Sequence, residues 1–274
     1  RTGSSSQGGG NQLDLQWAHG HGGEDWGVDY ALQYTRSGML RGNQRDLHRP
    51  AQVAAQPALA LAIGQRPDPA NIPLAPLLAG ACAPWQGQFT QWNYRPVPGA
   101  LPLQGDSCGS WDGPGYASLS DGVQALSGQL HGQWQLSAAT GLWLSAQYWR
   151  SRSRLSDGME VITGPHLRAT GKVDQFQDPR FGVIAPWRVL TPQEVGGLAA
   201  MDDRYREWML DLATGLRGQY GSHWNWNFSL SHTDYIAHRA RRRLLGDKVD
   251  AFFFGPSLGT TSTGMPIRQL DLAH

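Results

Sequence analysis

Six segments of this chain alternate apolar and polar side chains, which is the period-2 pattern of β-strands that have two different faces. They span residues 12–18, 27–35, 126–136, 142–149, 207–217 and 224–231, and none of them contains a proline. No charged residue falls on the apolar face of these segments. The charged residues on the opposite face are Asp14, Asp29, Glu207, Asp211 and Arg217. The pattern therefore predicts an all-β protein.

Alternation alone fits two kinds of protein. A soluble β-sandwich turns its apolar face inward, whereas a membrane β-barrel turns that face outward to lipid and keeps a polar interior. The connections separate the two, because short links within strand pairs (19–26, 137–141 and 218–223) alternate with long links of about 36–125 and 150–206. This alternation is typical of outer-membrane barrels. We therefore expect an antiparallel up-and-down transmembrane β-barrel segment of about six strands in three hairpins, with long extracellular loops and short periplasmic turns.

Aromatic residues gather at the ends of the predicted strands. One group lies next to the short links: Trp17, Trp26, Trp134, Trp143 and Trp224. Another lies near the opposite strand ends: Tyr34, Tyr148, Trp149 and Trp208. Indole rings favour the membrane interface, where the ring is in apolar surroundings and its N–H stays hydrated. The placement predicts two aromatic girdles, and the alternative is that these rings form the core of a sandwich.

Composition narrows the classes of function. Lys plus Arg is 23 and Asp plus Glu is 22, so the chain lacks the basic excess that a nucleic-acid-binding protein usually carries. A hydrophobic content of 40% is too high for a disordered chain. The chain begins with Arg1 and shows no signal peptide, so we expect that a signal was removed or that this is a piece of a longer protein.

The two cysteines, Cys82 and Cys108, fall in the first long link. Residues 50–102 hold 10 of the 17 prolines, which predicts irregular structure there. An oxidising periplasm would pair the two thiols, and loop entropy gives such a bond roughly 3–4 kcal/mol. We predict a disulfide that staples an extracellular loop; the alternative is two unrelated thiols.

Sequence motifs for catalysis, metal binding or cofactor binding are weak. No Cys/His spacing suggests zinc, and the glycine-rich segments match neither the P-loop nor the dinucleotide fingerprint. We therefore expect no metal site, no cofactor and no catalytic residue, and the chain is not predicted to be an enzyme.

Two further local patterns stand out. Thr191-Pro192-Gln193-Glu194 is a capping box that predicts a short helix. The basic run from His238 to Arg243 indicates a solvated loop, or attraction of an anionic ligand or of surface lipopolysaccharide.

Several local features resemble TonB-dependent outer-membrane receptors of Gram-negative bacteria, and the resemblance covers most of the chain. They are the strand after Asp203-Arg204-Tyr205 that ends Gly215-Leu216-Arg217-Gly218, the segment Trp224-Asn225-Trp226, and four loop segments, 108–111, 191–197, 243–245 and 253–259. No single motif is highly specific, and the weight lies in their order and spacing.

The resemblance implies a barrel of about 22 strands around a plug domain. Such receptors actively take up a scarce ligand of the siderophore, cobalamin or oligosaccharide class. This chain has neither the plug nor the TonB-binding segment, and six strands cannot close such a barrel. Residues 1–274 are therefore expected to be an internal fragment of a barrel in the cell outer membrane, one that aggregates when expressed alone because its strand edges are open.

The partners implied are the TonB complex, through a plug region not present in this chain, the lipid bilayer or lipopolysaccharide, and a small-molecule ligand, with no nucleic acid. Loop aromatics are the candidates for ligand contact, with ordinary loop packing as the alternative: Trp85, Trp92, Tyr94, Trp111 and Trp187. Polar-face candidates for the barrel lumen are His131, Asp211 and Arg217. Three other functions stay open: a passive porin-like channel, an outer-membrane enzyme barrel and a soluble β-sandwich binding module.

Overall fold

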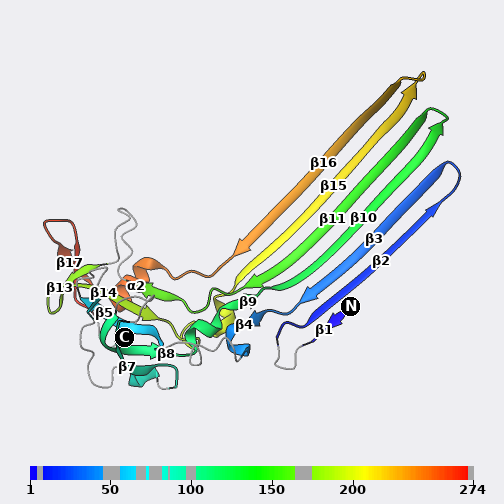
Figure 1. The fold of residues 1–274 in the computed structure, drawn as a ribbon. Coiled ribbons are helices and arrows are strands. Elements are labelled where there is room, and N and C mark those ends of the chain that lie inside the picture. The colour runs from blue at the N-terminus through cyan, green and yellow to red at the C-terminus, as the bar shows by residue number, and fades with distance from the viewer. Residues whose placement is uncertain are drawn as a thin grey trace. The chain divides into compact units, whose positions relative to one another are not determined.

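The computed structural model of the chain is built mainly from β-strands (Figure 1). It describes residues 1–4, 9–45, 56–65, 72–73, 82–85, 87–96, 103–163 and 175–270. The chain divides into two compact units. Unit 1 comprises Arg1–Leu40, Leu119–Leu155 and Asp203–Arg241, and unit 2 comprises Arg41–Ser118, Ser156–Asp202 and Arg242–His274. The prediction of an all-β protein with antiparallel sheets is confirmed.

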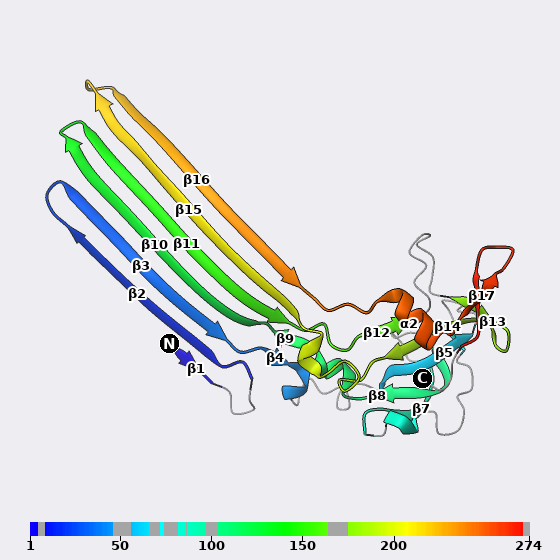
Figure 2. The same ribbon diagram turned by 180° about the vertical axis from the view of Figure 1, so that it is seen from behind.

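Unit 1 is a single antiparallel sheet of long strands. In spatial order its strands are β1 (Thr2–Gly3), β2 (Gln12–Gly22), β3 (Trp26–Ser37), β10 (Gly122–Ser137), β11 (Thr140–Leu155), β15 (Asp203–Tyr220) and β16 (Trp224–Ala240). Figure 1 and Figure 2 show these strands side by side from two opposite directions. Within the described part of the chain the sheet is open, with β1 and β16 at its edges.

The three predicted hairpins are β2–β3, β10–β11 and β15–β16, and β10 and β11 also pair with β3 and β15. The expectation of about six strands was too low, because the short β1 pairs with β2 and makes this a seven-stranded sheet among the described residues. The long strands also run further than predicted. β11 continues to Leu155, for example, since backbone pairing persists after the apolar alternation has stopped.

One face of the unit 1 sheet is a broad exposed apolar surface. Its register aligns Tyr30, Leu130, Ala146 and Leu212 in one row across four strands. Further along the same face, Trp17, Phe228 and Leu230 are exposed by 53%, 68% and 69%. Large exposed apolar patches occur where proteins contact a partner, a ligand or a membrane.

Unit 2 contains a second sheet, which the sequence did not predict. Its main strand order is β17 (Ser257–Thr260), β18 (Pro266–Arg268), β13 (Phe176–Asp178), β14 (Gly182–Val189), β5 (Ala58–Gln65), β8 (Leu103–Ser110) and β6 (Ile72–Pro73), with β12 (Val161–Thr163) on β14 and β7 (Thr90–Tyr94) on β8. Two of its pairings, β13–β18 and β6–β8, are parallel. The expectation of irregular structure over residues 50–102 was therefore wrong for β5, β6 and β7.

Shorter elements complete the described chain. A small ladder pairs β4 (Leu40–Arg41) with β9 (Ser118–Ser120). The helical elements are α2 (Gly246–Phe253) and the 3-10 turns η1 (Gly42–Gln44), η3 (Ala83–Trp85), η4 (Gly113–Tyr116) and η5 (Leu198–Ala200). Among the described helices, none is long and apolar enough to cross a membrane.

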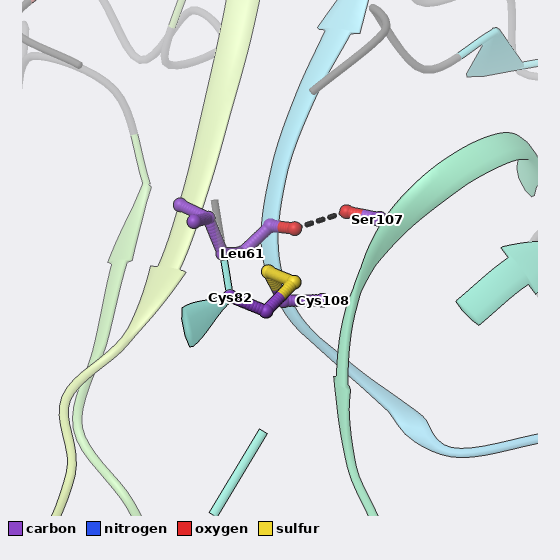
Figure 3. Close-up of a disulfide and its surroundings, with 4 residues drawn as sticks. All are labelled: Leu61, Cys82, Ser107 and Cys108. Carbon is purple, nitrogen blue, oxygen red and sulfur yellow. Dashed lines mark hydrogen bonds between the residues drawn. A yellow bond between two sulfur atoms is a disulfide. The ribbon is translucent and has the colours of Figure 1, made fainter. Parts of the chain in front are cut away.

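The core of the described protein lies in unit 2. One cluster consists of Ile162, Phe176, Ile184, Leu190, Phe254 and Leu270. A second cluster surrounds the disulfide between Cys82 and Cys108, whose Cα atoms are 5.7 Å apart (Figure 3). Beside it the Ser107 hydroxyl donates a hydrogen bond to the carbonyl oxygen of Leu61, which ties β8 to β5. A Cβ at Gly109 would lie 2.4 Å from Pro57 Cγ, so this close packing of β8 requires glycine.

The predicted helix at Thr191 is a turn instead. The Glu194 carboxylate accepts hydrogen bonds from the backbone N–H and the hydroxyl of Thr191, at 2.7 and 2.9 Å, as in a capping box. The backbone nevertheless leaves the helical conformation at Gly196 and Gly197, where φ is 84° and 102°. Two adjacent glycines with positive φ end the element before a second helical turn can form.

Candidate ligand-binding site

A hollow in unit 2 lies against α2 and has a volume of about 920 Å³. The chain segment after β16 and helix α2 supply one part of its wall, and the turn at residues 190–201 supplies the rest. Its apolar lining consists of Leu190, Val195, Met201, Leu244, Leu245, Val249, Ala251, Phe252 and Phe253. This lining suits the apolar or ring-bearing part of a small molecule.

Basic side chains line part of this hollow. Arg242, Arg243 and Lys248 contribute to its wall, and all three side chains are exposed. The acidic group in the wall, Glu194, is held by Arg188, whose Nη2 lies 2.5 Å from Glu194 Oε1. The wall therefore has an excess of positive charge toward any ligand.

Local contacts fix the ionised state of Glu194. Burial by itself would raise the pKa of this carboxyl, but hydrogen bonds from Arg188 and from the backbone N–H of Thr191 outweigh burial and lower the pKa below its usual value. The same Arg188 guanidinium lies 5.0 Å from the centre of the Phe253 ring. Arg188 thus joins the turn at Thr191 to α2 and holds two walls of the hollow together.

A buried carboxylate fixes the strands next to α2. Asp178 is fully buried, and it accepts hydrogen bonds from the backbone N–H groups of Leu270 and Arg180, each at 2.7 Å. Burial opposes ionisation of Asp178, but the hydrogen bonds from Arg180 and Leu270 outweigh it and lower its pKa. Asp178 is thus a structural anchor for β13 and the segment that follows β18.

The aromatic residues predicted to contact a ligand have different surroundings in the structure. The rings of Trp92 and Trp111 meet edge to face with centroids 5.7 Å apart, on the surface of unit 2. Tyr94, in contrast, is 1% exposed and its hydroxyl donates to the carbonyl oxygen of Pro57, so it packs in the interior. Trp187 donates from Nε1 to the carbonyl oxygen of Leu59. Trp85 lies in η3, and its side chain is outside the described part.

The predicted lumen residues share the polar face of the unit 1 sheet. His131 lines a shallow hollow of about 460 Å³ with Asp29, Gln129 and Ser145. Asp211 Oδ1 accepts a hydrogen bond from the Thr233 hydroxyl at 3.0 Å, and Arg217 Nη2 donates to Gln133 Oε1 at 3.2 Å. No group of three His, Cys, Asp or Glu side chains suited to a metal occurs among the residues that the structure describes.

The sequence reasoning missed α2 and its hollow. A signal was present, because Val249, Phe252 and Phe253 have the i, i+3, i+4 spacing of an apolar helix face. The hollow itself could not be read from the sequence, since residues near 190 and near 250 meet only in the fold.

Comparison with known proteins identifies no relative. Neither the protein-family models, nor the curated proteins, nor the solved structures include a match to this chain.

Proposed function

We propose that this chain is part of a TonB-dependent outer-membrane transporter that takes up a scarce ligand of the siderophore, cobalamin or oligosaccharide class. The observation that carries the proposal is the exposed apolar face on a sheet of long antiparallel strands. Such a face is favourable when it contacts lipid, because transfer of apolar surface out of water provides the driving force.

The dimensions of this face support the membrane assignment. On β10 the apolar positions run from Leu126 to Trp134, about nine residues, and a transmembrane β-strand needs about 9–11. Aromatic rings border this band. Trp26 lies opposite Trp134 at one end, and Tyr34 lies opposite Leu126 at the other. Aromatic girdles at both interfaces are a general feature of outer-membrane strands.

Unit 2 supports a role in ligand capture. A disulfide and two buried clusters give it a rigid core, and rigid scaffolds position binding loops well. The hollow beside α2 combines apolar walls with Arg242, Arg243 and Lys248. A ligand with apolar rings and negative charge fits this combination. In this proposal His131, Asp211 and Arg217 line the route that the ligand takes through the barrel.

Uptake by cells that produce the full-length protein tests the proposal. The probes are a panel of ⁵⁵Fe-labelled ferric siderophores, ⁵⁷Co-cobalamin and ¹⁴C-labelled maltooligosaccharides. We expect uptake of one probe that stops in a TonB-deficient host and on addition of a protonophore. We also expect Arg242→Gln/Arg243→Gln to weaken that uptake about tenfold, because charge-assisted contacts are lost. The control Arg95→Gln, which removes one positive charge elsewhere in unit 2, should keep the uptake.

Other outcomes contradict the proposal in separate ways. Uptake that persists without TonB and without a proton gradient would favour the passive porin-like channel, which shares every strand feature. Full-length protein that is monodisperse in buffer without detergent would favour the soluble binding module. In either case the active-transport assignment fails.

A further inference from the structure

An ion pair interrupts the apolar face of the unit 1 sheet on β16. His232 Nε2 lies 3.0 Å from Asp234 Oδ2, and the two residues share a face because they are two apart on the strand. On β15, the register places Leu212 opposite His232 and Leu210 opposite Asp234. Leu212 belongs to the row of apolar residues described above, so the pair lies within the apolar face.

Lipid is an unfavourable environment for this pair. The side chains of His232 and Asp234 are exposed by 67% and 53%. Ionisable groups lose their hydration in hydrocarbon, and charged side chains on the lipid face of a barrel strand are destabilising. Their mutual attraction offsets this loss only when the remaining polar atoms are also hydrogen-bonded. If this face lies in a membrane, the pair is more stable under protein than under lipid.

The histidines of β2 on the same face have aromatic cover. The ring of His19 stacks with that of Trp17 at a centroid distance of 6.5 Å and meets the edge of Tyr30 at 5.7 Å. His21 packs edge to face with Trp26 at 5.3 Å. Among the described residues, no aromatic ring packs against the imidazole of the β16 pair. The β16 pair therefore differs from the other polar groups in this band.

The pair also has unused hydrogen-bonding capacity. Within the described part of the chain, His232 Nδ1 and Asp234 Oδ1 have no hydrogen-bond partner. A protonated imidazole donates from both nitrogens, and a carboxylate accepts at both oxygens. A matching surface must therefore offer an acceptor to Nδ1 and a donor to Oδ1. A second His232–Asp234 pair has this composition, so the pair is complementary in charge to itself.

A two-fold axis along the membrane normal brings two such pairs together. Membrane strands tilt by about 35–45°, so the facing β16 strands of two copies cross instead of running side by side. When they cross between His232 and Asp234, each imidazole lies beside the carboxylate of the other copy. Exposed apolar side chains next to the pair on the same face, Leu230 and Ile236, then pack around the crossing. Such a self-complementary contact is the usual form of a homodimer interface.

We propose that two copies of this protein associate in the membrane through the apolar face of β16, where His232 Nδ1 of each copy donates to Asp234 of the other. The inference rests on the membrane location given under the proposed function. It goes beyond transport, because it assigns an interaction surface on the face opposite to the polar one that would carry the ligand. β16 lies at the edge of the described sheet (Figure 1).

Cross-linking of the full-length protein in outer-membrane vesicles tests the inference. Leu230→Cys places a single thiol beside the pair, and a bis-maleimide joins thiols of neighbouring copies; the native cysteines form a disulfide and do not react. We expect a product of twice the mass of the chain. The matched control is Leu130→Cys on the same face of β10. It should give no such product, because β11 and β15 lie between β10 and β16.

Charge exchange tests the pairing itself in the Leu230→Cys protein. His232→Asp leaves two acids at this site, and Asp234→His leaves two bases. Each variant alone should cross-link at least tenfold less, because like charges meet and charge-assisted hydrogen bonds are lost. The two variants produced together with different affinity tags should again cross-link to each other. A role of the pair within one chain would give no such recovery.

The variant His232→Leu/Asp234→Leu tests the same contact without adding a charge. It should insert at least as well as the wild type, because an ion pair is removed from the apolar face. Its cross-linking at Leu230→Cys should also fall at least tenfold, since both hydrogen bonds between the copies are lost. Resistance of each protein to extraction of the vesicles with urea measures insertion.

Four results would overturn the inference. Wild type that inserts but gives no product of double mass would show that lipid covers the pair, and the membrane location would stand. A cross-linked product of another mass would assign the face to a different protein. Cross-linking that the charge exchange and the double leucine variant leave unchanged would assign the dimer to other contacts. Failure of the wild type to insert would overturn the membrane location and the inference together.

Discussion

The two units of this chain use apolar side chains in opposite ways. Every buried apolar side chain among the described residues belongs to unit 2, where Phe176 and Ile184 are fully enclosed. In unit 1 large apolar side chains such as Leu15 and Phe228 are exposed by more than half. Unit 2 is therefore organised around its own interior, whereas the sheet of unit 1 leaves its large apolar side chains exposed. Under the proposed function, the stability of the unit 1 sheet depends on lipid, whereas unit 2 folds around its own core.

We expect the largest difference between the two units when one apolar side chain is truncated in each of them. Ile184→Ala removes a fully buried side chain and should destabilise unit 2 by about 2–5 kcal/mol, because a cavity remains. Leu126→Ala, on a side chain exposed by 44%, should cost less than about 1 kcal/mol in detergent micelles. Hydrogen exchange of β14 and β10, followed by mass spectrometry, measures both. Equal losses in the two units would contradict the comparison.

Loss of the disulfide should affect unit 2 alone. Cys82→Ala/Cys108→Ala opens a loop with a sequence separation of 26 and should lower the stability of unit 2 by about 3–4 kcal/mol. Hydrogen exchange should rise in β5 and β8 and stay unchanged in β11. Reduction of the wild type is the matched control and should reproduce the effect. Faster exchange in β11 would show that the two units do not behave separately.

The two faces of β10 should respond differently to a new charge. Leu130→Arg places a cation in the middle of the apolar band and should cost about 2–4 kcal/mol in a bilayer. Gln129→Arg adds the same charge on the polar face, where water can solvate it, and should cost much less. Chemical unfolding of both variants in lipid vesicles gives the difference. A larger loss for Gln129→Arg would reverse the assignment of the faces.

The smallest expected effect is a pH response confined to unit 2. The pKa of Asp178 is lowered in the folded protein, so its contribution is complete above about pH 4 and is lost as the pH falls through the lowered folded value. Asp178→Asn should lower the free energy of unfolding of unit 2 by about 1–3 kcal/mol at neutral pH. The variant should also lose most of the decrease in stability at acid pH. Denaturant unfolding at several pH values measures this pH dependence, and Asp106→Asn, at an exposed side chain, is the control. An unchanged acid profile in Asp178→Asn would refute the anchor role.

The sequence predicts unit 1 well and unit 2 poorly, and the reason is physical. Long strands with one apolar face and one polar face carry a regular period of two, so the segments around Leu130 and Leu212 could be recognised in isolation. β6 and β7 are short, lie in a proline-rich region and gain stability from partners distant in sequence. Their pairing leaves little local pattern.

The candidate sites follow the same rule. Loop aromatics could be selected by type, but only the fold separates Trp92, on the surface, from Tyr94, in the interior. Contacts across the sheet depend on register, because Arg152 and Arg206 are far apart in the chain and become neighbours only through the pairing of β11 with β15. A single sequence does not fix that register.

Site-directed spin labelling along β10 tests the central claim that the apolar face of unit 1 contacts lipid. The full-length protein in outer-membrane vesicles is labelled at single cysteines placed from Leu126 to Gln133; the native Cys82 and Cys108 are paired and do not compete. We predict that accessibility to oxygen peaks at Leu126, Gly128, Leu130 and Gly132, while a water-soluble nickel complex reaches the positions between them. Equal access of both reagents on both faces, or the reverse alternation, would contradict the account.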